Sequence, residues 1–106
     1  MTEYEDYERK CSSIREENSE LLDSFESWIR NKGLSETTAK KHRENINFYI
    51  NEFLLYESPK PASQGVDEVG MFLGYWFIRK AMWANEASVK ANATSLKKFY
   101  DFMFER

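Results

Sequence analysis

The sequence predicts an all-α protein of four helices, and three observations support this fold class. Apolar residues recur at helical spacing in four segments. No segment alternates apolar and polar residues for long enough to form a strand. The chain has only 4 Gly and 2 Pro among 106 residues, which suits helices joined by short connections. This length predicts a single domain with one modest core, and the 8 Phe, 6 Tyr and 3 Trp argue against disorder.

The first helix is expected from about Ser19 to Lys32, and Gly33 suits the left-handed cap that ends it. Its inner face is predicted from helical spacing: Leu21, Leu22, Phe25, Trp28 and Ile29. Residues 1–16 are mostly charged and lack a convincing apolar stripe. We therefore expect an acidic tail or helical extension at 1–16, followed by a four-helix domain at 17–106.

The remaining helices are expected at about 36–56, 67–83 and 86–104, with a proline-containing loop after the second. The inner stripes are predicted to be Ala39, His42, Ile46, Tyr49, Ile50 and Phe53 in the second helix, and Val89, Ala93, Leu96, Phe99, Tyr100 and Met103 in the fourth. The third segment is apolar on most sides, which is typical of a central helix. Gly70 and Gly74 lie four residues apart and predict close approach of a neighbouring helix.

A short pattern occurs twice, fifty residues apart, at the starts of the second and fourth helices. Each copy has a residue that can cap a helix, a hydroxyl three residues later, and then an apolar residue and a lysine. The two copies are Ser35, Thr38, Ala39 and Lys40, and Asn85, Ser88, Val89 and Lys90. Matching starts predict a pseudo-symmetric helical module.

An ordered series of weak motifs runs through residues 19–106. The motifs are Phe25-x-x-Trp28, Gly33-Leu34-Ser35-x-x-Thr38, Ile46-x-x-Tyr49-x-x-x-Phe53-Leu54, Val66-Asp67-x-Val69-x-x-Phe72-Leu73 and Leu96-Lys97-Lys98-Phe99-Tyr100-Asp101-Phe102-Met103. Together they resemble the N-terminal core-binding domain of tyrosine recombinases, the SAM-like domain of phage integrases. This resemblance implies a compact four-helix bundle that forms half of a clamp around duplex DNA.

The resemblance also implies that a separate C-terminal domain carries out strand cleavage and joining. The catalytic signature of that domain includes a tyrosine and His-x-x-Arg, whereas His42 is followed by Arg43, Glu44 and Asn45. We therefore expect no catalytic residue and no cofactor, and an excised N-terminal domain or a stand-alone relative. Duplex DNA and other recombinase protomers are the implied partners.

Outward polar residues of the second and fourth helices are the candidate DNA contacts. Lysines can neutralise phosphates, and an asparagine amide can pair with an adenine edge. The candidates are Thr37, Lys40, Lys41, Lys90, Asn92, Thr94, Lys97 and Lys98. The plainer interpretation is a solvated helix face, since Glu36 and Glu44 share the face of the second helix. A helical protein–protein interaction domain without DNA binding therefore stays open as the second function class.

The charge balance favours that second class, because the chain has a net charge of −3. Much of the acidity lies in residues 1–20, where seven acidic residues outweigh three basic ones and leave residues 21–106 at about +1.

The cysteine and histidine content gives no indication of a disulfide or a metal site. Cys11 has no partner for an internal disulfide, which predicts a reducing, cytoplasmic location. No Cys/His cluster has metal-ligand spacing, and His42 is expected to be a packed residue.

The longest apolar run, Val69 to Ile78, is about half of the roughly 20 residues that span a bilayer. We therefore expect no membrane contact. No Gly-rich phosphate loop occurs, and no small-molecule ligand is expected.

Overall fold

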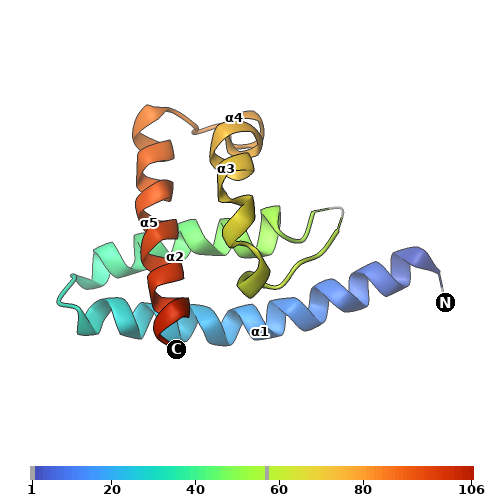
Figure 1. Ribbon diagram of the computed structural model, residues 1–106, viewed down its shortest axis with the longest axis horizontal. Coiled ribbons are helices and arrows are strands. Elements are labelled where there is room, and N and C mark those ends of the chain that lie inside the picture. Colours follow the sequence, from blue (N-terminus) through green and yellow to red (C-terminus); the bar gives the residue numbers. More distant parts are fainter. Residues whose placement is uncertain (1, 57) are drawn as a thin grey trace.

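Four helical segments cross one another in the computed structural model, which describes residues 2–56 and 58–106 (Figure 1). Helix α1 spans Glu3–Asn31, and α2 spans Glu36–Phe48 and continues into a π-helical turn, η1, at Tyr49–Phe53. The 3-10 turns η2 (Ala62–Gln64) and η3 (Val66–Glu68) lead into the third segment, made of α3 (Val69–Met71), the π-helical turn η4 (Phe72–Trp76) and α4 (Phe77–Lys80). Helix α5 spans Glu86–Glu105. The described residues form no strand, so the predicted all-α class with four helices is confirmed.

Helices α1 and α2 lie side by side, and the other two segments run across them (Figure 1). Helix α5 contacts both α1 and α2, while η4 contacts η1 and α5.

A network of charges also joins α1 to α2. Arg43 Nη1 donates to Asp23 at 2.8 Å and to the buried Glu26 at 3.4 Å, and Arg30 pairs with Glu26 from the same helix. These contacts fix α2 against α1.

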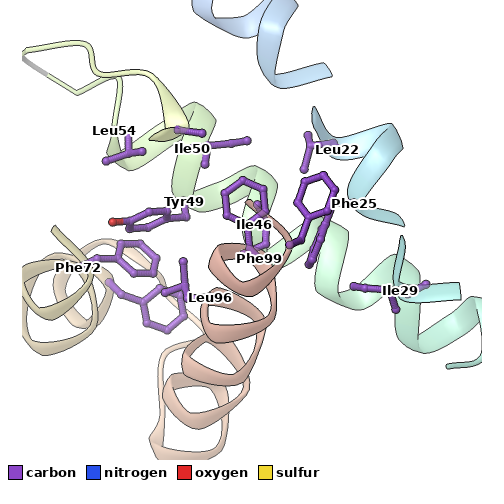
Figure 2. Close-up of a cluster of buried hydrophobic side chains, with 14 of the residues drawn as sticks. Leu22, Phe25, Ile29, Ile46, Tyr49, Ile50, Leu54, Phe72, Leu96 and Phe99 are labelled. Atoms are coloured by element: carbon purple, nitrogen blue, oxygen red, sulfur yellow. The ribbon is translucent and has the colours of Figure 1, made fainter. Parts of the chain in front are cut away.

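Aromatic rings fill the core where the four segments meet (Figure 2). Phe25 of α1 meets Phe99 of α5 edge to face at 5.3 Å, and Tyr49 meets Phe72 edge to face at 4.8 Å. Such pairs add about 0.5–1.5 kcal/mol each to the effect of burial. The buried members of the predicted stripes are Leu22, Phe25, Ile29, Ala39, Ile46, Tyr49, Ile50, Leu96 and Phe99, which confirms those positions. Ala93 is exposed, so its placement in the core was wrong.

Helix α1 begins at Glu3, well before the predicted start at Ser19, and Thr2 caps it by accepting from the Glu5 amide. The described part of residues 1–16 is therefore helical from Glu3 onward, as the start of α1. An inner stripe runs along this part of the helix and just beyond it, at Tyr7, Cys11, Ile14 and Asn18. Cys11 and Ile14 are buried against Leu55, and the Tyr7 hydroxyl donates to the Leu55 carbonyl. Sequence reasoning missed this stripe because two of its four members, Cys11 and Asn18, are not counted as strongly apolar.

The third segment departs most from expectation. Its helix ends at Lys80 rather than near Trp83. The predicted close approach at Gly70 and Gly74 is also wrong, because a Cβ added to either glycine would meet nothing within 4 Å. Both glycines face open space, so one side of this apolar segment lies at the surface. The segment is therefore not a fully enclosed central helix.

Candidate nucleic-acid interface

The repeated pattern at the starts of α2 and α5 consists of helix caps. Ser35 accepts from the Thr38 amide at 3.2 Å, and the Ser35 hydroxyl donates to the Thr38 hydroxyl at 2.9 Å. At α5 the Asn85 side chain accepts from the Ser88 amide while Ser88 accepts from the Asn85 amide, a reciprocal capping box. The predicted caps are thus confirmed. The two hydroxyls have intramolecular partners, which accounts for them without any ligand.

A polar contact lies where α5 crosses α2. Ser95 is fully buried on α5, and its hydroxyl oxygen lies 2.7 Å from Nδ1 of His42. Asn45 Nδ2 donates to the same oxygen at 3.0 Å. Burial lowers the pKa of His42 below its usual 6.5, and the nearby positive charge of Lys98 lowers it further. His42 is therefore packed, as predicted, and the charge of Lys98 lies close to the crossing.

The predicted lysines divide into paired and unpaired groups. Lys40 lies 4.0 Å from Glu36, and Lys90 lies 3.2 Å from Glu86, in exposed pairs one helical turn apart. Such exposed pairs stabilise a helix by only about 0.3–0.5 kcal/mol, so a phosphate can compete for these lysines. Lys41 and Lys97, by contrast, are exposed on α2 and α5 and have no ion pair with any described residue. Lys98, which is partly buried beside His42, likewise lacks a carboxylate partner among the described residues.

The two predicted threonines are exposed, but Asn92 is not. Thr37 lies on the surface of α2, and Thr94 on α5 donates to the Lys90 carbonyl at 3.1 Å. Asn92 is 3% exposed, and its amide donates to the Ser88 carbonyl at 2.9 Å. Its predicted role of reading a base edge is corrected accordingly, because the amide is enclosed within the core side of α5.

Two cations that the sequence did not single out lie at the end of α4. The Arg79 guanidinium lies over the Tyr75 ring at 4.5 Å, and the Lys80 ammonium lies over the Tyr56 ring at 5.5 Å. Neither has a carboxylate partner among the described residues. The spacing of four residues between Tyr75 and Arg79 could have indicated from the sequence that the guanidinium lies over this ring.

Tyr49, which is buried, and Tyr100, which is partly buried, are poor candidates for a nucleophile. Tyr49 donates to the Gly65 carbonyl, and Tyr100 donates to the Ala62 carbonyl at 2.8 Å. Burial raises the pKa of both hydroxyls well above the usual value of 10, which keeps them protonated. Across the described ranges, 2–56 and 58–106, no His, Cys, Asp and Glu side chains group as a metal site, and no helix is long and apolar enough to cross a membrane.

Comparison of the chain with protein-family models, with curated proteins and with solved structures found no match.

Proposed function

We propose that this chain is a duplex-DNA-binding module of a site-specific recombinase of the tyrosine recombinase type, with the core-binding, SAM-like form of the four-helix fold. In this proposal α2 and α5 lie against the duplex, and a separate catalytic domain cleaves and joins the strands. The observation that carries the proposal is that α2 and α5, which cross at a buried polar contact, each bear lysines near that contact in sequence that have no acidic partner among the described residues. Lys41, Lys97 and Lys98 are those lysines.

Phosphate contacts made by these lysines are the source of affinity. Each lysine that neutralises a phosphate releases condensed counterions, so affinity falls as salt concentration rises. The exposed threonines Thr37 and Thr94 add hydrogen-bonding groups that suit the DNA backbone. Phosphate contacts carry no sequence information, and Asn92 is unavailable for base readout. The module therefore binds many sequences with similar affinity.

The acidic half of α1 limits where DNA can bind. The first 20 residues account for all of the excess negative charge, and this end of α1 projects away from α5 (Figure 1). Repulsion of phosphates by this end favours the opposite, lysine-bearing side of the molecule. The weak positive balance of residues 21–106 then suffices for modest binding at low salt.

Fluorescence anisotropy with a labelled duplex tests the proposal. If about four phosphates are neutralised, log K should fall with log salt at a slope of roughly −3 to −4. The variant Lys41→Ala with Lys97→Ala should bind about tenfold or more weakly, and its slope should flatten by about two units. Both side chains are exposed, so thermal stability should change little.

Lys10→Ala is the control for position: it removes one positive charge from an exposed site on the acidic half of α1, and the single variants Lys41→Ala and Lys97→Ala are compared with it. It should leave both the affinity and the salt slope near the parent values. Equal binding by the double variant and the parent, or binding that salt does not weaken, would overturn the proposal.

A further inference from the structure

The third segment carries a second apolar stripe on its outer side. Its members are Met71, the adjacent Gly74 and Tyr75 about one turn later, and Ile78 about one turn after those. Met71, Tyr75 and Ile78 are 57%, 53% and 55% exposed. We call this set the outer stripe. It lies on an element at the edge of the molecule, with α5 on one side only (Figure 1).

Burial in the core does not account for the outer stripe. The inner side of the same segment already supplies Phe72 and Phe77, both fully buried, to the aromatic core. A surface helix of a monomer normally has polar residues on its outer side. A continuous exposed apolar set is instead typical of a surface that another molecule covers. Gly74 adds a flat place in the middle, with nothing within 4 Å of where its Cβ would lie.

Charges of opposite sign flank the two ends of the outer stripe. Asp67 lies at the start of the segment and Arg79 near its end, and both are exposed. Neither Asp67 nor Arg79 forms an ion pair with any described residue, and the Arg79 guanidinium lies over the ring of Tyr75, which belongs to the stripe. The neighbouring Glu68, in contrast, is already paired with Lys60 at 2.8 Å. The outer stripe thus has an acidic end and a basic end, each with an unused charge.

We propose that the outer stripe is the docking surface for a second copy of this chain. Two copies pack antiparallel, related by a two-fold axis that passes near Gly74. This arrangement brings Asp67 of each chain to the end where Arg79 of its partner lies. It also places the two glycines opposite each other, where the backbones can approach closely, and it opposes the two helix dipoles. A parallel arrangement would instead bring like charges together, which is destabilising.

The expected dimer is weak and does not need DNA. One helical stripe from each chain falls in the small class of interfaces, which bury less than about 1,200 Å² in total. We therefore expect a monomer–dimer equilibrium that sedimentation velocity resolves between about 5 and about 500 μM protein. Because the measurement contains no DNA, its result is independent of the proposed α2–α5 function.

Two matched tyrosine variants give the first test. Tyr75→Glu places a charge in the middle of the outer stripe and should remove the dimer at every concentration. The new Glu lies one turn before Arg79, so the helix keeps a favourable pair. Tyr4→Glu changes another exposed tyrosine, in the first turn of α1, and should leave the dimer as in the parent. Circular dichroism should show both variants folded.

A charge exchange gives the second test. Asp67→Lys alone and Arg79→Glu alone should each weaken self-association, because each homodimer then holds two like-charged contacts. A mixture of these two variants restores opposite charges at both ends, so a heterodimer should form with about the parent affinity. A parent chain that stays monomeric to about 500 μM overturns the proposal. So does a mixture that associates no better than either variant alone.

Discussion

Nδ1 of His42 lies 2.7 Å from Oγ of Ser95, and this contact joins α2 to α5 where they cross. The Ser95 hydroxyl also accepts from Asn45, so it has its own proton to give to the neutral imidazole. A protonated ring would lose that acceptor and would lie near the positive charge of Lys98. The contacts at the crossing therefore favour the neutral form of His42 over the protonated form.

Stability should depend on pH through His42. The pKa of His42 is lowered in the folded chain, whereas an unfolded histidine takes up its proton near pH 6.5. The unfolded state therefore binds more protons below that pH, and the contribution of His42 is complete above it and falls as the medium becomes more acidic. Urea unfolding at several values between about pH 5.5 and about pH 7.5 should show this loss. The variant His42→Gln should show a smaller loss over the same range, and equal losses would contradict the assignment.

The same histidine should make DNA binding pH-dependent if α2 and α5 face the duplex. A phosphate near the crossing favours the charged imidazole and raises the pKa of His42. Binding should then strengthen as the pH falls from about 7.5 to about 6, and this gain should vanish in His42→Gln. A parent chain whose affinity stays constant over this range would place the duplex elsewhere.

Ile14→Ala should destabilise the fold by roughly 2–4 kcal/mol, although residue 14 belongs to the acidic half of α1. Ile14 is 7% exposed and packs with Cys11 against Leu55. The change leaves a cavity between α1 and the end of the second segment. Ile78→Ala removes the same atoms from an exposed site and should cost under about 1 kcal/mol at low protein concentration. Equal free energies of unfolding for the two variants would mean that the start of α1 does not pack.

Phe99 and Phe104 form a second matched pair on α5. Phe99 is fully buried against Phe25, while Phe104 is 94% exposed. Phe99→Ala should lower the free energy of unfolding by about 3–5 kcal/mol, and Phe104→Ala should change it by less than about 0.5 kcal/mol. Chemical denaturation of both variants measures the difference. A similar loss from the two would show that the faces of α5 are assigned wrongly.

Gly65→Ala should destabilise the chain by about 1–3 kcal/mol through overpacking. An added Cβ would lie 2.5 Å from the Tyr100 hydroxyl and 2.6 Å from Cδ1 of Leu54. Tyr100 cannot move away without losing its hydrogen bond to the Ala62 carbonyl. Gly70→Ala is the control: it has open space and lies in a helix, so it should be neutral or slightly stabilising. Thermal melts that rank the two variants in the opposite order would contradict this packing.

Local signals in the sequence predicted the local features of the structure. Ser35 and Asn85 act within one turn of their helices, so their caps could be identified from spacing alone. The ion pairs of Lys40 and Lys90 could also be predicted from the sequence, since each lysine has a glutamate four residues before it. These features do not depend on how the helices pack.

Features that depend on how the helices pack could not be predicted from residue spacing. The third segment is apolar on both sides, and periodicity does not say which side meets the core. Asn92 occupies a core position that the sequence pattern gave to Ala93, because its amide finds an acceptor one turn back in the helix. The extension of the core along α1 escaped notice because Asn18 is buried through a hydrogen bond to Asn51 rather than through apolar contact.

The π-helical turn η1 makes the chain tolerant of a shortened sequence at one point. Its wide hydrogen bond, from the Leu54 amide to the Tyr49 carbonyl, holds one residue more than an ordinary turn. Deleting the exposed Glu52 lets this turn close as regular α-helix, and every later side chain keeps its direction. The same deletion at the exposed Glu44, inside α2, rotates all that follows in the helix by about 100° and takes Ile46 and Tyr49 out of the core. We therefore expect the chain to accept a one-residue deletion in the middle of this helix, at the π-helical turn.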